Sequence, residues 1–180
     1  MAGTHVAFLR GINVGRAKRV AMADLRSIVE DLGYGDVRTL RSSGNVVFTA
    51  RGAGAGAGAS ARIEEALSAR CGVLARVTVV TAAELAAAAA GNPLLEVGTD
   101  HSRLFVAFLS RPADRTRLTP LAEQDWAPEA LALGGRVAYL WCPLGVIASR
   151  LSEAVSHLLG DAVTTRNWAT VTKLLGLIEV

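Results

Sequence analysis

The amino-acid sequence predicts an α+β fold made of two tandem ferredoxin-like halves, each with the order β-α-β-β-α-β and an antiparallel sheet. The first observation is a repeat. The tetrapeptide Val-Ala-Phe-Leu occurs at residues 6–9 and again at 106–109, and such a repeat in a chain of 180 residues indicates two similar units. The second observation is that strand-like and helix-like hydrophobic patterns follow both copies in the same order.

The first half gives the clearer pattern. Residues 5–10 are expected to form a strand, because their apolar stretch Val6-Ala7-Phe8-Leu9 is typical of a strand covered on both faces. Apolar side chains at helical spacing predict a helix over 22–33, ended by Gly33. The remaining expected elements are strands at 36–41 and 46–48 around a turn at 43–45, a helix over 60–71 with Ser60 as its N-cap, and a strand over 76–80. The Gly-Ala repeat of residues 51–59 predicts a mobile loop between the third strand and the second helix.

The second half repeats this order after a bridging helix over 82–90. Its expected elements are a strand at 104–109, helical turns over 113–124 that Pro120 interrupts, a hairpin of 130–133 and 137–142 across Gly134-Gly135, a helix with the apolar stripe Ile147, Leu151, Val155, Leu158 and Leu159, a strand at 162–164 and a final helix over 168–178. We therefore expect two domains. The first covers 1–92 and includes the bridging helix, and the second covers 101–180 and includes the C-terminal helix.

Composition excludes several classes of protein. Apolar residues make up 51% of the chain and charged residues 19%, which excludes a disordered protein. No apolar run approaches the roughly 18 residues of a membrane helix, and the start lacks the layout of a signal peptide. We therefore expect a cytoplasmic protein with two reduced cysteines and no membrane partner. The three histidines are isolated in the sequence, so we expect no metal site, and no pattern indicates a cofactor.

The loop between the first strand and the first helix is the first candidate for a binding site. Residues 10–19 hold four basic side chains, and no acidic residue occurs before Asp24. Glycines in such a loop allow tight turns that direct backbone N–H groups outward, and the following helix start adds a positive dipole. This combination suits a phosphate, sulfate or carboxylate group. The alternative is an ordinary loop with solvated arginines. The net charge of +3 does not by itself indicate nucleic acid.

Two further polar segments accompany this loop. In the predicted topology, the turn Ser43-Gly44-Asn45 emerges at the same end of the sheet as the first loop, so it should be a neighbour of Asn13. The third segment covers 165–174. There Asn167 is expected to cap the last helix, whose buried stripe would be Trp168, Val171, Leu175 and Ile178. Arg166, Thr170 and Lys173 would lie together away from that stripe.

These three segments carry a resemblance to a known family. Arg-Gly-Ile-Asn-Val-Gly stands at 10–15, Ser-Gly-Asn-Val at 43–46, and Arg-Asn-Trp-Ala-Thr-Val-Thr-Lys-Leu at 166–174. In these motifs the chain resembles the bacterial family called domain of unknown function 1697 over essentially its full length. The resemblance implies two ferredoxin-like halves and implies that the three polar segments belong together. It implies no particular activity.

The sequence therefore favours a binding module for an anionic ligand, either a phosphate-bearing small molecule, a nucleotide or a nucleic-acid backbone. One alternative is a structural or assembly protein in which the polar segments brace the fold. Another is an enzyme acting on a phosphorylated or carboxylated small molecule, although no general base accompanies the segments. The candidate ligand-binding residues are Arg10, Gly11, Asn13, Gly15, Ser43, Gly44, Asn45, Arg166, Asn167 and Lys173.

Overall fold

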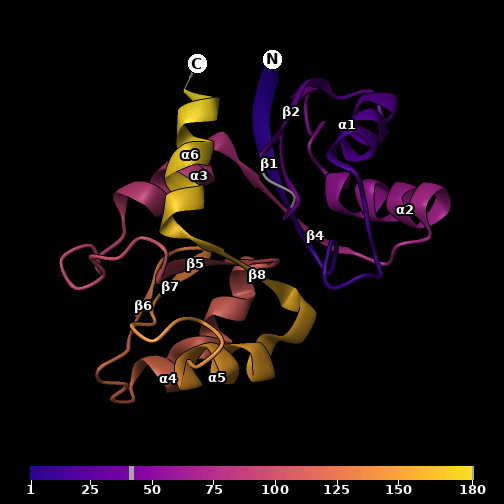
Figure 1. Ribbon diagram of the computed structural model, residues 1–180. Coiled ribbons are helices and arrows are strands. Elements are labelled where there is room, and N and C mark those ends of the chain that lie inside the picture. The colour runs from indigo at the N-terminus through magenta and orange to yellow at the C-terminus, as the bar shows by residue number, and fades with distance from the viewer. Residues whose placement is uncertain (41–42, 180) are drawn as a thin grey trace. The chain divides into compact units, whose positions relative to one another are not determined.

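The computed structural model describes residues 1–40 and 43–179, and these residues form two compact units. The first unit comprises Met1–Ala83 together with the end of the chain from Leu177, and the second comprises Glu84–Gly176. Each unit contains one four-stranded antiparallel sheet with helices (Figure 1). The predicted α+β class with two such halves is therefore confirmed.

The first unit has the element order of a ferredoxin-like fold. Its sheet has the strand order β2-β3-β1-β4, and the central strand β1 is antiparallel to both β3 and β4. The bounds are β1 Ala2–Arg10, α1 Met22–Asp31, β2 Gly35–Leu40, β3 Asn45–Arg51, α2 Ala59–Cys71 and β4 Arg76–Thr81.

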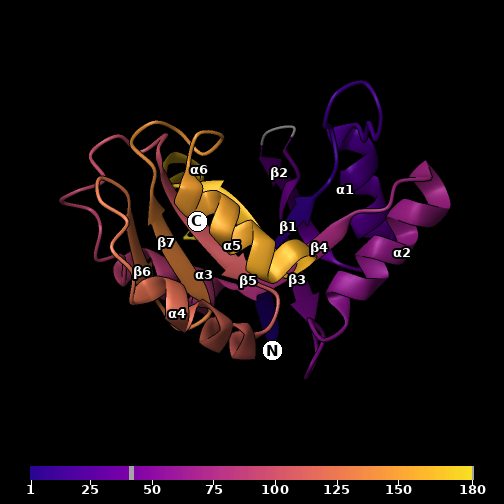
Figure 2. The same cartoon turned by 90° about the horizontal axis from the view of Figure 1, so that it is seen from below.

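The core of the first unit lies between the sheet and its two helices. Alternate residues of β1, including Ala7 and Leu9, join Phe48 of β3 in one cluster with Ile28 of α1 and Ile63 of α2. Figures 1 and 2 both show α1 and α2 on the same side of the strands. The burial of these apolar side chains on one face leaves the alternate residues of each strand on the opposite face of the sheet.

The second unit repeats this arrangement. Its sheet has the order β6-β7-β5-β8, with β5 in the central place that β1 holds in the first unit. The bounds are α3 Ala82–Ala90, β5 Leu104–Leu109, a 3₁₀ helix η1 Pro112–Leu118, α4 Thr119–Ala122, β6 Ala130–Leu133, β7 Val137–Trp141, α5 Arg150–Leu159, a 3₁₀ turn η2 Gly160–Ala162, β8 Val163–Asn167 and α6 Trp168–Ile178. The two Val-Ala-Phe-Leu segments therefore lie in β1 and β5, the two central strands.

Helices lie on both faces of the second sheet. On one face, Leu121 of α4 and Leu151 of α5 pack in a core with Ala107 of β5, and Figure 2 shows α4 and α5 in front of the strands. On the other face, the buried Tyr139 of β7 donates a hydrogen bond to the carbonyl oxygen of Ala88 in α3, at 2.7 Å. Hence α3 is tied to the second sheet. The domain boundaries expected from the sequence, 1–92 and 101–180, stay a prediction.

Several local expectations are wrong. Ser60 does not cap α2, because Gly58 holds the N-cap position in a left-handed conformation and the helix begins at Ala59. Ile147 is fully exposed and lies before α5, because the Ser149 side chain accepts a hydrogen bond from Ser152 N–H and so starts that helix later. In α6 the buried residues are Trp168, Thr170, Val171 and Leu174, so Thr170 lies on the buried side, and Leu175 and Ile178 are only partly buried.

The Gly-Ala segment forms a series of turns rather than an open coil. Backbone hydrogen bonds run from Ala55 to Gly52, from Ala57 to Gly54 and from Ala59 to Gly56. Ala55 packs against the core of the first unit. The segment lies between β3 and α2, as expected. Within the described residues, no helix has both the length and the apolar character that crossing a membrane requires.

Candidate functional site

The first polar segment is a loop closed at its base by Asn13. The Asn13 backbone N–H donates to Lys18 O at 2.8 Å, and its side-chain Nδ2 donates to Val20 O at 3.1 Å. The Val20 backbone N–H donates back to Asn13 Oδ1 at 2.9 Å. Ile12 and Val20 on either side of the loop are buried. These bonds and anchors hold residues 13–20 as one closed turn that projects from the sheet.

The tip of this loop is basic and exposed. All six residues from 14 to 19 are exposed, and they include Arg16, Lys18 and Arg19. None of these three cationic side chains has a hydrogen bond or ion pair with the residues the structure describes. Lys18 has a φ of 58°, a left-handed conformation that costs a non-glycine residue energy and persists only where the surroundings enforce it. We name residues 14–19 the basic loop.

The basic loop leads into the start of α1. The N-cap residue is Ala21, which has no side chain able to accept a hydrogen bond, so no side-chain cap covers the first turn. The first backbone N–H groups of a helix lack partners within the helix, and the helix dipole places partial positive charge there. The loop cations and these N–H groups are close in sequence and share one end of the first unit.

The second polar segment packs against the start of this loop. Gly44 O accepts a hydrogen bond from Leu9 N–H at 2.9 Å, and Gly44 Cα lies so close to Leu9 and Ile12 that a Cβ atom would meet each at 2.8 Å. The turn therefore contacts the end of β1 and the start of the first loop at Ile12, whereas a contact with Asn13 stays a prediction. Arg41 and Ser42, the first residues of the polar stretch before the turn, lie outside the described residues.

Asn45 supports the turn rather than facing outward. Its side chain is completely buried, and its Nδ2 donates to Leu40 O at 2.9 Å and to Ser43 Oγ at 3.1 Å. Arg10 ends β1 and is half-buried opposite Arg76 in the register with β4. The structure thus uses Asn13 and Asn45, both expected to bind a ligand, as braces of the backbone.

The third polar segment lies in the second unit. Asn167 ends β8 and its Oδ1 accepts the Thr170 backbone N–H at 2.9 Å, which makes it the predicted cap of α6. Arg166 is half-buried and donates to Thr165 O at 2.9 Å. Burial lowers the pKa of Arg166 to about 10, so its guanidinium remains protonated at neutral pH. Lys173 is exposed on α6. The candidates therefore divide between the units: Arg10 to Asn45 belong to the first, and Arg166, Asn167 and Lys173 to the second.

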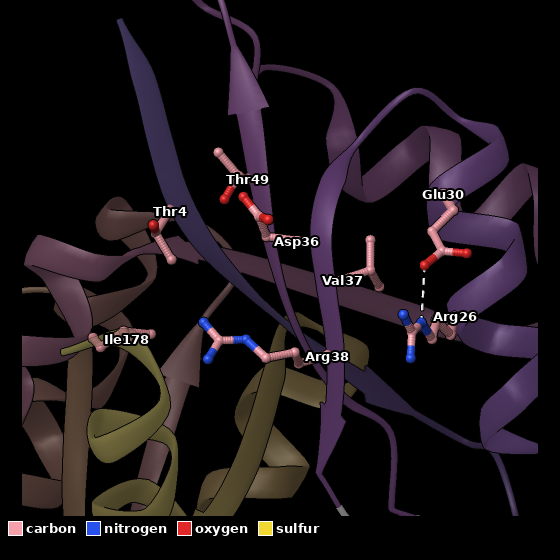
Figure 3. A pocket seen from close by; sticks show the side chains of 8 residues that line it. All are labelled: Thr4, Arg26, Glu30, Asp36, Val37, Arg38, Thr49 and Ile178. Atoms are coloured by element: carbon pink, nitrogen blue, oxygen red, sulfur yellow. Dashed lines mark hydrogen bonds and ion pairs between the residues drawn. The ribbon is translucent and has the colours of Figure 1, made fainter. Parts of the chain in front are cut away.

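A cavity of about 730 Å³ lies elsewhere in the first unit, around β2 (Figure 3). The pattern of residues 36–41 predicts a strand with exposed arginines and gives no indication of a cavity. Asp36 and Arg38 are two charged residues in a short strand, but the sequence gives no sign of the bulge between them. The cavity is lined by Thr4, Arg26, Glu30, Asp36, Val37, Arg38, Thr49 and Ile178.

A second cavity of about 340 Å³ lies in the second unit, between the segment 126–129 and the start of α5. Cys142 lines it, and burial raises the pKa of this thiol, which favours the unreactive protonated form. Within the described ranges 1–40 and 43–179, no three His, Cys, Asp or Glu side chains gather in a way that would hold a metal ion.

Comparisons with known proteins place the chain in a family. Residues 2–139 match the family described as "Protein of unknown function (DUF1697)", so the chain belongs to this family. No curated protein matches the chain. Among solved structures, a conserved bacterial protein from Streptococcus pneumoniae has a similar fold, with a TM-score of 0.80 and 19% sequence identity over 99% of each chain. At this level of identity the likeness shows the fold alone.

Proposed function

We propose that the protein binds an anionic ligand at the basic loop of its first unit. The observation that supports this best is a contrast within one segment. Asn13 closes the loop through three hydrogen bonds at its base, whereas the three cations at its tip have no partner among the described residues. A closed backbone that presents unpaired charge loses little conformational entropy when it binds.

Three features of the loop suit phosphate chemistry. Arg16 and Arg19 carry guanidinium groups, which match the geometry of phosphate oxygens through paired N–H donors. Lys18 adds a third positive charge. The start of α1, which no side chain caps, offers backbone N–H groups and the positive end of a helix dipole. The ligand classes we propose are a phosphate-bearing small molecule, a nucleotide or a nucleic-acid backbone.

A triple variant tests this proposal. Arg16→Gln, Lys18→Asn and Arg19→Gln together remove the charges, and asparagine tolerates the left-handed backbone at position 18. A variant matched in charge removes three exposed arginines elsewhere, by Arg51→Gln, Arg70→Gln and Arg150→Gln. Because Arg70 pairs with Asp31 and Arg150 lies over the Trp126 ring, the shift caused by each probe is compared with the same variant's unfolding without a probe. Thermal unfolding of both and of the wild type is measured with inorganic phosphate, ATP and a single-stranded oligonucleotide, because a ligand that binds the native state raises its stability.

We expect at least one probe to stabilise the wild type and the matched variant but not the triple variant. The apparent affinity should fall about tenfold or more, because each charge-assisted hydrogen bond contributes about 1.5–3 kcal/mol. If the oligonucleotide is bound, the slope of log K against log salt should become shallower by about 2–3 in the triple variant. Equal stabilisation of all three chains would contradict the proposal, as would a lack of stabilisation by every probe.

We propose a structural role for the asparagines as a second candidate. Asn13, Asn45 and Asn167 all use their side-chain amides on nearby backbone groups. The Arg166 guanidinium likewise donates to a backbone carbonyl of its own segment. In this candidate the polar motifs brace the fold, and substitution of the three asparagines lowers stability without changing the affinity for any phosphate probe.

A further inference from the structure

The cavity around β2 combines three features that the basic loop does not share. They are an irregularity in the edge strand, a buried arginine nitrogen without a partner, and an exposed carboxylate that does not pair with this arginine. Figure 3 shows the residues that line the cavity. The first two features are uncommon in a folded protein, and all three occur within residues 35–38.

The irregularity is a β-bulge. In the ladder between β2 and β3, Gly35 pairs with Thr49 and Arg38 pairs with Val47, so three steps along β2 match two along β3. Asp36 occupies this bulge with a φ of 49°. A non-glycine residue in the left-handed region is strained, and bulges are frequent where a side chain must be redirected at a binding site.

The partnerless arginine nitrogen belongs to Arg38. Its Nε atom is buried and has no hydrogen-bond partner among the described residues. Leaving a buried charged donor unsatisfied is costly, so such a group in a native structure calls for an explanation. Figure 3 shows the guanidinium extending into the cavity toward the side of Thr4 and Ile178, away from the Arg26–Glu30 pair.

The opposite charges are those of Arg38 and Asp36. Among the eight residues drawn in Figure 3, the one marked interaction is between Arg26 and Glu30, at 2.9 Å. The two charges of this exposed ion pair balance each other. Although Arg38 and Asp36 are only two positions apart, they do not pair with each other, and this leaves one positive and one negative group facing the same space.

Two hydroxyl groups lie on the same face of the sheet. Thr4 of β1 pairs in register with Thr49 of β3, and Arg38 is opposite Val47, two residues along β3 from Thr49. Because residues two apart in a strand share a face, Thr4, Thr49 and Arg38 form a polar group on one side of the sheet. Figure 3 shows the Asp36 carboxylate beside Thr49. Hydroxyls can both donate and accept, so they suit either end of a charged ligand.

We propose that this cavity binds a small zwitterion, with a carboxylate on the Arg38 guanidinium and an ammonium group on the Asp36 carboxylate. A lone anion would face the Asp36 charge, and a lone cation would face Arg38. A ligand with both charges satisfies the two groups at once and supplies the missing partner of Arg38 Nε through a bidentate pair. The volume of about 730 Å³ lies within the range of small-molecule sites and accepts zwitterions larger than glycine.

The test uses a series of simple compounds on the full chain. Glycine, 4-aminobutyrate and 6-aminohexanoate carry both charges at increasing separation, whereas acetate and butylamine carry one each. Binding is followed by NMR through the Nε–H signal of Arg38, identified by its absence from the Arg38→Lys spectrum, and through the backbone N–H signals of Asp36 and Thr49. These signals locate the ligand as well as measure its affinity.

We expect one of the zwitterions to bind at least about tenfold more tightly than acetate or butylamine, and to shift the Arg38 Nε–H signal. Arg38→Lys should weaken that binding about tenfold or more, because lysine keeps the charge but lacks the planar fork. Asp36→Asn, which suits the left-handed backbone, should reduce the affinity for the zwitterion to that for acetate. Arg51→Gln, an exposed arginine at the end of β3, is the matched control and should change nothing.

Three results would overturn the proposal. The first is that no zwitterion binds the wild type at millimolar concentration. The second is that acetate binds as tightly as every zwitterion. The third is that binding survives in both Arg38→Lys and Asp36→Asn. Because Arg38→Lys and Asp36→Asn change separate residues, misfolding of one variant does not decide the outcome. A negative result at the cavity says nothing about anion binding at the basic loop, because the two sites share no residue.

Discussion

At the scale of single residues, the asparagines of the polar motifs serve the backbone. Asparagine tolerates a positive φ and carries a donor and an acceptor on a short side chain, so it can close a turn on itself. Asn13 has a φ of 52° and bridges to Val20 at both its amide atoms. Asn45 is fully buried. The sequence patterns predicted that Asn13 and Asn45 bind a ligand, but the residue type alone does not distinguish a residue that braces the backbone from one that binds a ligand.

The cap of α6 gives a direct test at this scale. Asn167→Ala removes the acceptor for Thr170 N–H, and we expect a loss of about 1 kcal/mol in the free energy of unfolding, within the range of about 0.5–2 for lost caps. Asn167→Asp keeps the acceptor and should stay near the wild type. Urea unfolding of the three chains measures the difference, and an alanine variant as stable as the wild type would show that the cap contributes nothing.

At the scale of elements, most helices and strands follow from local patterns. The helix over 82–90, the strand over 104–109 and the helix over 168–178 were predicted with the bounds observed, because apolar periodicity and adjoining polar residues agree there. Errors arose where a backbone conformation decided the boundary. Gly58 displaced Ser60 as the cap of α2 through its left-handed φ of 73°.

The close contact at Gly44 is one such backbone requirement. Gly44→Ala places a Cβ atom 2.8 Å from both Leu9 and Ile12 in a residue with a φ of 81°. We expect a loss of about 2–5 kcal/mol, from about 1–2 for the left-handed backbone and about 1–3 for overpacking. Gly52→Ala is the control, since it has a φ of 96° and open space, and should lose only the backbone part.

Chemical or thermal unfolding of the two variants separates these contributions. A Gly44→Ala chain no less stable than the Gly52→Ala chain would mean that the turn can move away from the first loop without cost. The expected result would instead establish that packing, and not only φ, fixes the turn of residues 43–45 beside the loop.

At the scale of the whole molecule, the sequence predicted the repeated order of elements but not the sheet against which α3 packs. No local pattern in the bridging helix indicates which element it packs against. In the structure, Glu84 forms an ion pair with Arg136 at 3.2 Å, and Ala88 accepts from Tyr139. These are contacts over about fifty residues in sequence, and local patterns cannot predict them. The cavity around β2 escaped prediction for the same reason, since it depends on a bulge that only the pairing of two strands reveals.

This arrangement predicts unequal stabilities for two fragments. A fragment of residues 82–180 keeps α3, whereas one of residues 101–180 lacks α3 and leaves the Tyr139 hydroxyl without its acceptor, the carbonyl oxygen of Ala88. We expect the longer fragment to unfold at a clearly higher urea concentration. Tyr139→Phe in the longer fragment should lower the midpoint by part of this difference, corresponding to about 1 kcal/mol. Equal midpoints for the two fragments would show that α3 does not stabilise the second sheet.

The bulge in β2 has a consequence for how the protein behaves in a crowded solution. β2 ends the first sheet, so its outer backbone groups have no strand beside them within that sheet. A straight edge of this kind can recruit the strand of another molecule and start aggregation. An extra residue at Asp36 breaks the regular spacing of donors and acceptors, and the charges of Asp36 and Arg38 discourage a second apolar strand. The strain at one aspartate thus helps keep separate copies of the chain from joining edge to edge.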